Sequence, residues 1–599
     1  MNYRDIRSLP AMFYAQAERY GDQPFLWRKQ SREWRSLTWK DAAERTRALA
    51  AGLRRLGIGK GDRVTLVAEN RPEWLIADIA IMTAGAITVP AYTTNTVNDH
   101  IHILSDSGSK CAIVSTAALA EALLPAAART PGVDHVIAIE PPAVPVPDGV
   151  RVVSWDSLLQ DGRSAGDSRC TTDGQIARTD TCCIIYTSGT SGKPKGVMLS
   201  HGAILCNCMG AEDLLRRLPQ FEDHGEVFLS FLPLSHAYEH TAGQFLPVAI
   251  GAQIYYAEGI DKLTANLAEV RPTVMTAVPR LYEVMHARIR HGVERAGGLK
   301  RFLFEEAVRL GRKAYETPES LSLWERIENV LLDRLVRKKV HERFGGRLKA
   351  FVSGGAPLNY DIGVFFVALG LRILQGYGQT ESAPVVSCNL FPRNKLRTVG
   401  PPFPGVEVRI ADDGEILVRG ELVMQGYWNN PKATAEAIRD GWLHTGDIGR
   451  FDADGYIEIT DRKKDIIVNS GGDNLSPARV EGMLTAAPEI GQAMVFGDKR
   501  PHLVAIVVPD ADFLAAWSKR NGKNGDLARA AQDGALHKEL YEAVERVNAN
   551  LSVIERVRRI MVAPEAFTIE NEMMTPTLKL RRHVITNRYR EELERLYGR

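Results

Sequence analysis

The sequence predicts an α/β protein with a large N-terminal domain of layered α/β subdomains, a small β subdomain and a smaller α+β C-terminal domain. Helical patterns alternate with short apolar strands through most of the first 460 residues. After about residue 400 the pattern changes to short alternating strands joined by Asp-Gly turns. From residue 465 onward short strands mix with polar helices, which indicates a separate unit of about 135 residues.

The alternating part is typical of sheets that are largely parallel, since each strand is followed by a helical connection. Helical patterns occupy 40–56, 262–270 and 279–292. The apolar run 74–92 contains Asp78, and we interpret it as a buried helix, a glycine turn and a strand rather than a membrane span. The strand candidates are VTLVAE (64–69), CAIVS (111–115), HVIAIE (135–140), CCIIYTS (182–188), VFLSFLPL (227–234), VMTAVP (274–279) and LKAFVSGG (348–355).

Composition and charge exclude several classes of protein. Hydrophobic residues make up 45% of the 599 residues, and 75 Lys and Arg stand against 73 Asp and Glu. This balance argues against a dedicated nucleic-acid-binding protein. Seven cysteines do not make a disulfide scaffold, and none has the spacing of a zinc site. The N-terminus lacks the apolar core of a signal peptide, so we expect a cytoplasmic protein.

A helical insert rich in Arg and Lys is predicted over 286–348. The simpler interpretation is a solvated helix face, and the alternative is a patch for a membrane surface or an acidic partner.

The strongest chemical signal is a loop that follows a buried apolar strand. Small residues let backbone N–H groups approach phosphate oxygens closely, hydroxyls add donors and lysines add charge. The loop is not a Walker A loop, because Lys193 precedes a proline and the glycine spacing differs. It therefore predicts a phosphate site of another kind, built from Thr187, Ser188, Gly189, Thr190, Ser191, Gly192, Lys193, Pro194, Lys195 and Gly196.

This loop resembles the phosphate loop of the adenylate-forming superfamily, which includes acyl-CoA synthetases, luciferases and the adenylation domains of peptide synthetases. Six further motifs of the family follow in order across nearly the whole chain. The resemblance implies a large N-terminal domain over 1–461 and a small, mobile C-terminal lid domain over 462–599. The motifs are FLPLSHAYE (231–239), SGGAPL (353–358), QGYGQTE (375–381), HTGDIG (444–449), DRKKDIIVNSGG (461–472) and PTLKLRR (576–582).

The resemblance also implies which residues bind ATP, Mg²⁺ and coenzyme A. Glu381 and Thr187 are assigned to the metal, since magnesium takes oxygen ligands. The residues assigned to ATP or CoA are Thr187, Ser188, Gly189, Thr190, Ser191, Gly192, Lys193, Lys195, Gly354, Ala356, Pro357, Gln375, Gly376, Tyr377, Gly378, Thr380, Asp447, Arg462, Lys464, Gly471, Gly472 and Lys579.

Some of these assignments have a physical reason beside the resemblance. Tyr377 offers a flat face on which adenine could stack, although a core tyrosine is the alternative. A carboxylate at Asp447 can accept hydrogen bonds from both ribose hydroxyls. Without the resemblance, Asp447 is a turn residue and Arg462 a surface cation.

The catalytic assignments are Lys579, Thr187, Glu381 and His236. In the family the lysine that matches Lys579 reaches the reacting carboxylate and the α-phosphate, where a cation stabilises developing negative charge. His236 matches a position beside the substrate carboxylate, with a satisfied core histidine as the alternative. Lys464 matches the hinge about which the C-terminal domain rotates for the second step, and Gly471 and Gly472 match the channel for the CoA thiol.

The sequence therefore predicts a long-chain fatty acid–CoA ligase that forms AMP, because the helical insert and the last motifs are similar to that branch of the family. The alternatives are a fatty acyl-AMP ligase that loads an acyl carrier protein, and a ligase for medium-chain or other carboxylic acids. The expected partners are small molecules and no nucleic acid, and peripheral contact with a membrane is left open.

Overall fold

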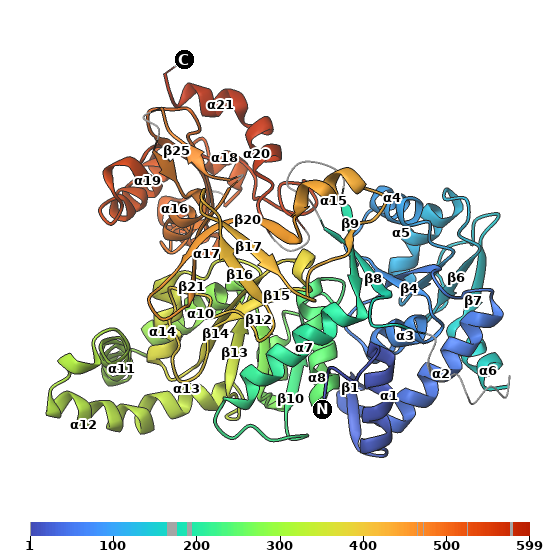
Figure 1. The fold of residues 1–599 in the computed structure, drawn as a ribbon. Helices are drawn as coiled ribbons and strands as arrows, with labels where there is room; N and C mark the ends of the chain where they lie inside the picture. Colours follow the sequence, from blue (N-terminus) through green and yellow to red (C-terminus); the bar gives the residue numbers. More distant parts are fainter. Residues whose placement is uncertain are drawn as a thin grey trace.

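The computed structural model describes residues 2–164, 176–187, 194–463, 465–470, 473–523, 525–575 and 579–598 (Figure 1). Within these residues, two large mixed sheets make up most of the N-terminal domain, and a smaller antiparallel sheet leads from them to the C-terminal domain. The α/β fold class predicted from the sequence is thereby confirmed.

The first sheet has the order β18-β9-β8-β4-β3-β5-β6-β7, and its strands from β8 to β7 are parallel. Helices α2 and α3 pack on one face and α4 and α5 on the other, so its central strands are buried apolar runs. The strands are β3 (Arg63–Val67), β4 (Ile87–Pro90), β5 (Cys111–Val114), β6 (His135–Ala138), β7 (Arg151–Ser154), β8 (Thr181–Thr187), β9 (Lys195–Ser200) and β18 (Gly426–Tyr427). The helices are α1 (Leu9–Tyr20), α2 (Trp39–Arg55), α3 (Pro72–Thr83), α4 (Val97–Ser107), α5 (Ala117–Ala128) and α6 (Trp155–Ser164).

The second sheet has the order β15-β14-β13-β12-β10-β11-β1-β2, with antiparallel pairs at its two edges. Its strands are β1 (Pro24–Gln30), β2 (Glu33–Thr38), β10 (Val227–Ser230), β11 (Gln253–Tyr256), β12 (Val274–Ala277), β13 (Ala350–Ser353), β14 (Ile373–Gly378) and β15 (Val385–Cys388). One face packs against α7 (His201–Arg216) and α8 (Leu246–Ile250), and the π-helix η1 (Glu239–Phe245) leads into α8. The other face packs against α9 (Leu263–Val270), α10 (Pro279–Ala296), α11 (Gly298–Glu316) and α14 (Tyr360–Ala368).

The predicted insert forms a helical arm on that second face. It continues from α10 and α11 through α12 (Leu323–Leu332), the π-helix η3 (Asp333–Arg337) and α13 (Lys338–Arg343). Figure 1 shows α11 and α12 projecting at the lower left, away from the C-terminal domain.

The small sheet contains β16 (Glu407–Ile410), β17 (Glu415–Arg419), β19 (Ile438–Arg439), β20 (Trp442–Phe451) and β21 (Ile457–Arg462), with α15 (Pro431–Ala437) before β19. Its strands pair antiparallel, as the Asp-Gly turns predicted. In the C-terminal domain, β24 (Ile490–Phe496), β25 (Leu503–Pro509) and β26 (Val557–Val562) form a sheet between two helical layers. Its other elements are β22 (Ile467–Val468), β23 (Asn474–Leu475), α16 (Pro477–Leu484), α17 (Ala511–Asn521), α18 (Leu527–Ala530), α19 (Gly534–Asn548), α20 (Arg582–Arg588) and α21 (Arg590–Arg595).

The predicted strands are all present, but several end earlier than the apolar run does. The run 227–234 gives a strand only as far as Ser230, because Pro233 cannot donate to a strand ladder. The run 74–92 forms a helix and a strand as predicted. Among the described residues, no helix is both long and apolar enough to cross a bilayer.

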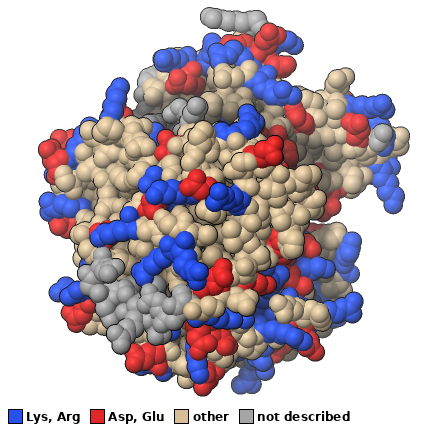
Figure 2. Space-filling model, turned by 90° about the vertical axis from the view of Figure 1, so that its right-hand side faces the viewer, with Lys and Arg blue, Asp and Glu red and all other residues tan. Residues whose placement is uncertain are grey.

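Charged side chains of both signs are present on the face shown in Figure 2. This is the side of the molecule that carries α4 to α6, and its basic and acidic residues are interspersed around uncharged areas. This agrees with the balanced composition of the chain.

Candidate active site

A cavity of about 780 Å³ lies where the two large sheets, the small sheet and the C-terminal segment 579–581 meet. Crevices at the carboxyl ends of parallel strands are the usual ligand sites of α/β folds. The predicted site residues that line it are Thr187, Lys195, His236, Gly354, Gly376, Tyr377, Gly378, Thr380, Glu381, Arg462 and Lys579.

The two ends of the predicted phosphate loop lie on adjacent strands. Thr187 ends β8 and Lys195 begins β9, and the two residues are antiparallel partners. Of the residues between them, Ser188, Gly189, Thr190, Ser191, Gly192 and Lys193 lie outside the described residues. Since both ends line the cavity, the loop starts and returns at its wall.

A tyrosine that sequence analysis missed connects this loop to Glu381. The Tyr427 hydroxyl donates to Oε1 of Glu381 (2.8 Å), and Nζ of Lys195 lies 5.0 Å from the centre of the Tyr427 ring. Tyr427 belongs to β18, which pairs with β9 beside the loop. Burial and then the Glu381 carboxylate raise the pKa of the Tyr427 hydroxyl above its usual value, so it stays protonated and can donate.

Asp447 and Arg462 face each other because β20 and β21 form a hairpin. They are direct cross-strand partners, and Nε of Arg462 donates to Oδ1 of Asp447 (3.1 Å). The Tyr377 hydroxyl donates to the other carboxylate oxygen (2.7 Å). Burial raises the pKa of Asp447, while Arg462 and the Tyr377 hydrogen bond oppose that rise. Asp447 thus contacts two residues that line the cavity, Tyr377 and Arg462, without being among the described lining residues itself.

Lys579 reaches the same cavity from the C-terminal domain. Its backbone N–H donates to the Thr575 hydroxyl (3.1 Å). Loss of bulk water around the ammonium group lowers the pKa of Lys579, Arg462 lowers it further, and Asp447 and Glu381 oppose the effect. The lysine, two carboxylates and an arginine therefore interact across the domain interface.

His236 is half-buried and is neutral at ordinary pH. Burial, followed by the positive charge of Lys579, lowers the pKa of His236 to about 4. Its Nδ1 accepts the backbone N–H of Tyr238 (3.2 Å), which leaves Nε2 to carry the proton. His236 can therefore donate one hydrogen bond within the cavity.

Some predicted residues do not reach the cavity. Ala356 and Pro357 are exposed and are absent from its described lining. Lys464, Gly471 and Gly472 lie outside the described residues, so the hinge and the CoA channel stay predictions.

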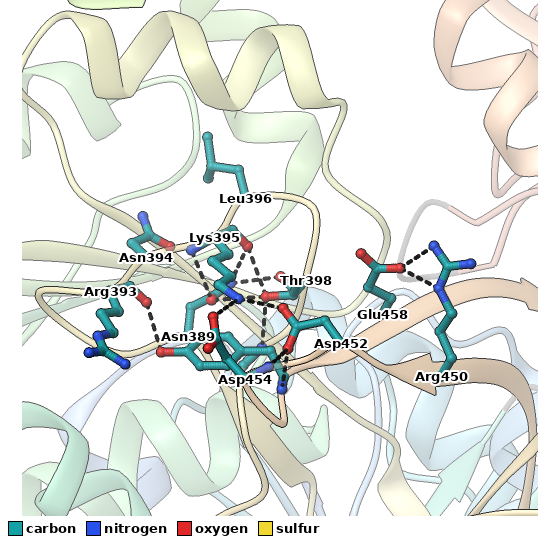
Figure 3. A network of polar contacts seen from close by, with 12 residues as sticks. Asn389, Arg393, Asn394, Lys395, Leu396, Thr398, Arg450, Asp452, Asp454 and Glu458 are labelled. Carbon is teal, nitrogen blue, oxygen red and sulfur yellow. Dashed lines mark hydrogen bonds and ion pairs between the residues drawn. The ribbon is translucent and has the colours of Figure 1, made fainter. Parts of the chain in front are cut away.

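Gln375 belongs to a predicted motif but turns away from the cavity. Its side-chain amide donates to the backbone carbonyl of Leu396. Leu396 lies in a loop that is held in turn to the β20–β21 hairpin, where Nζ of Lys395 contacts Asp452 and Asp454 at 2.5 Å each (Figure 3). Gln375 therefore anchors the loop to β14, while Lys395 joins the same loop to the hairpin that carries Asp447.

The remaining part of the cavity is apolar. Its wall comes from α7, β10, α8, β12 and β15 and from the residues that pack between them. The apolar lining residues here are Ala211, Leu214, Leu215, Phe228, Leu246, Val274, Val352, Val385, Cys388 and Phe403.

A buried carboxyl group stands next to this apolar wall and was also missed by sequence analysis. Glu239 accepts hydrogen bonds from the Ser230 and Thr276 hydroxyls (2.6 Å each), and Thr276 lines the cavity. Burial raises the pKa of Glu239 to about 7, although both hydroxyls lower it. Only its place in FLPLSHAYE marked it in the sequence.

Comparison with known proteins agrees with this geometry. The AMP-binding enzyme family matches residues 13–428, and the AMP-binding enzyme C-terminal domain matches residues 464–599. The chain is 36% identical over 581 residues to a long-chain-fatty-acid–CoA ligase of Mycobacterium bovis, covering 94% of this chain and 93% of that one. It is 30% identical to a mouse long-chain-fatty-acid–CoA ligase, covering 99% and 87% of the two chains.

Solved structures share the fold. The adenylation domain of a carboxylic acid reductase from Segniliparus rugosus, in complex with AMP and a co-purified carboxylic acid, has a TM-score of 0.79 at 20% identity, covering 99% of this chain and 94% of that one. The anthranilate CoA ligase AuaEII, in complex with anthranoyl-AMP, has a TM-score of 0.72 at 19% identity, and 99% of each chain is covered. Fold and site together define an adenylate-forming enzyme. The chain belongs to the AMP-binding enzyme family.

Proposed function

We propose that the chain is an AMP-forming ligase that joins a long-chain fatty acid to coenzyme A. The observation that supports this most is a single cavity in which charged groups for a nucleotide adjoin an apolar wall for an acyl chain. The relatives named as long-chain-fatty-acid–CoA ligases, aligned over nearly the whole chain, support the same assignment.

In the proposed first step, a carboxylate oxygen of the fatty acid attacks the α-phosphorus of ATP, the bond to the bridging oxygen breaks, and pyrophosphate leaves. Lys579 lies beside the reacting carboxylate and stabilises the negative charge of the transition state at the α-phosphate. Asp447 accepts hydrogen bonds from the ribose, since each of its oxygens keeps a lone pair beside its contact to Tyr377 or Arg462. His236 donates through Nε2 to the substrate carboxylate.

Mg²⁺ would be held by Glu381 and the Thr187 hydroxyl, and would neutralise phosphate charge. The donor set fits, because magnesium prefers carboxylate and hydroxyl oxygens. Tyr427 occupies Oε1 of Glu381, and within the described residues Oε2 has no hydrogen-bond partner.

In the same proposal, Lys195 and the loop that precedes it bind the phosphates of ATP. Thr380, Gly354, Gly376 and Gly378 would border the nucleotide. The loop residues Ser188, Gly189, Thr190, Ser191, Gly192 and Lys193 would complete the phosphate site.

In the proposed second step, the thiol sulfur of CoA attacks the acyl carbon and the thiol proton passes to water. The bond from the acyl carbon to the phosphate oxygen breaks, and AMP leaves with the bonding pair. Lys464 is the proposed hinge that withdraws Lys579 between the steps, and Gly471 and Gly472 the proposed passage for the pantetheine arm. No insertion stands between Arg462 and Gly472 in the sequence that would block such a rotation.

Pyrophosphate release from Mg-ATP, measured with fatty acids of increasing length and with or without CoA, tests the proposal. We expect sustained release that needs both a long chain and CoA, because about 0.8 kcal/mol per buried CH₂ favours long chains in an apolar pocket. If CoA does not accelerate adenylation, the acceptor of the acyl group would be a carrier protein instead of CoA. A preference for short acids would overturn the chain-length assignment.

We also propose that the enzyme works in peripheral contact with a membrane, since long acyl chains partition into bilayers.

A further inference from the structure

The outer face of the helical arm carries an apolar stripe that no other described element covers. Its residues are Leu323, Trp324, Ile327, Val330 and Leu331 of α12 and Leu335 of η3, and we call them the α12 stripe. Trp324 is 80% exposed and Leu323 77%, and the other four are between 49% and 60% exposed. Single exposed apolar side chains are common, but a continuous stripe at helical spacing marks an interaction surface.

The arm cannot turn this stripe inward, because buried polar contacts fix its rotation. Arg337 is buried and donates to the carbonyls of Ala368 (2.6 Å) and Ala307 (2.8 Å) and to Oδ1 of Asn329 (2.7 Å). Glu325, on the same inner side, pairs with Lys313 of α11 (2.8 Å). Rotating the helix to bury the α12 stripe would leave the Arg337 charge without its partners, which is strongly unfavourable.

Cations follow the stripe at its C-terminal end. Arg334 is next to Leu335 of the stripe in the sequence, and Lys338 and Lys339 follow three and four residues after Leu335. These three side chains are exposed and make no ion pair with any described residue. Between residues 323 and 343 there are six Lys and Arg against four Asp and Glu.

We propose that the α12 stripe docks on an anionic phospholipid bilayer, with the helix lying in the plane of the headgroups. Apolar residues on one face bounded by basic residues are what interfacial helices use, and Trp324 suits the headgroup boundary. The unpaired cations complement anionic lipids. Figure 1 shows α12 at the outer edge of the projecting arm, so the helix can meet a flat surface without hindrance from the C-terminal domain.

Binding of the α12 stripe to lipid does not depend on the ligase reaction. The advantage of such binding to the enzyme rests on the proposed function, because a bilayer would hold the fatty acid substrate. A sedimentation assay reads lipid binding alone, and a turnover assay in detergent reads the reaction alone. The failure of one proposal is therefore distinguishable from the failure of the other.

The test is sedimentation of the full chain with vesicles of equal parts phosphatidylglycerol and phosphatidylcholine, or of phosphatidylcholine only. We expect binding to the anionic vesicles that weakens with salt. Ile327→Asn with Leu331→Asn should lower the partition coefficient about tenfold or more, because two inserted apolar side chains are lost. The matched control is Val553→Asn with Ile554→Asn, which changes two similarly exposed apolar residues of the C-terminal domain and should bind like wild type.

Equal sedimentation of wild type and the Ile327/Leu331 variant would overturn the proposal. So would a failure of wild type to bind vesicles together with a concentration-dependent increase in mass that the same variant abolishes, since a second copy would then cover the stripe. Unchanged thermal unfolding of the variant shows that the loss is not a folding defect.

Discussion

Glu239 is a buried carboxyl group beside the apolar part of the cavity, and its replacement by glutamine tests the electrostatics of this region. Its two oxygens accept hydrogen bonds from the Ser230 and Thr276 hydroxyls at 2.6 Å. Burial raises its pKa from the usual 4.5 to about 7, because the hydroxyls replace only part of the lost hydration. Glutamine has the same shape and no charge to lose.

The sign and size of the effect follow from this shift. A carboxyl group whose pKa is higher in the folded state binds its proton more tightly there, so its contribution to stability is complete below about pH 4.5. That contribution is lost as the pH rises to about 7. A shift of about 2.5 pH units corresponds to about 3 kcal/mol. Glu239→Gln should therefore become more stable relative to wild type by up to about 3 kcal/mol across this range.

Denaturant unfolding of both proteins at steps from about pH 5 to about pH 8 measures this difference, and other titrating groups cancel in it. Thr276→Val is an internal check. It removes one hydrogen-bond donor to the carboxylate, so the pKa of Glu239 should rise further. The pH at which the stability contribution of Glu239 is fully lost should then be higher than in wild type. A stability difference between wild type and Glu239→Gln that stays constant with pH would refute the reasoning.

Three other outcomes are expected at the site. Lys579→Ala should lower acid-dependent pyrophosphate release by on the order of 10²–10³ but largely spare thioester formation from supplied acyl-adenylate; an equal fall in both assays would contradict a role limited to the first step. Tyr427→Phe frees Oε1 of Glu381 for the metal beside Oε2, so the Mg²⁺ concentration for half-maximal activity should fall about tenfold; an unchanged value would show that Oε1 takes no part in metal binding. Leu215→Trp narrows the apolar part of the cavity, and kcat/KM should fall about fourfold for each CH₂ of the substrate that is displaced. An unchanged dependence of kcat/KM on acyl chain length would place the acyl chain elsewhere.

Local patterns predicted the strands that carry part of the site but not the pairing of its residues. The alternating strands and the Asp454-Gly455 turn indicated an antiparallel hairpin, yet Asp447 and Arg462 become direct partners only through a register shift between Ile448 and Gly449. Their roles came from the resemblance alone, because nothing in a hairpin register specifies a ribose. Gln375 shows the converse, since a side chain within a recognised motif donates to Leu396 rather than lining the cavity.

The contacts that sequence analysis missed are long-range ones. Tyr427 and Glu381 are 46 residues apart and meet because β18 joins the edge of the first sheet while Glu381 follows a strand of the second. Glu239 and Thr276 meet in the same way, across a π-helix and a neighbouring strand. No periodicity within a segment encodes the packing of one sheet against another, so these pairs needed the tertiary structure.

The helical arm shows why an amphipathic pattern predicts a face but not its direction. The spacing of Leu323, Ile327 and Leu331 normally indicates the side that packs on the core. Here the core side is fixed instead by Arg337, which satisfies backbone carbonyls of α11 and of the residues that end α14. Those carbonyls are about thirty residues away from Arg337 on either side along the chain, so the local sequence pattern cannot predict their hydrogen bonds to it. Because a buried arginine without partners costs more than exposing a few apolar side chains, the polar contact decides the rotation and leaves the apolar stripe outside.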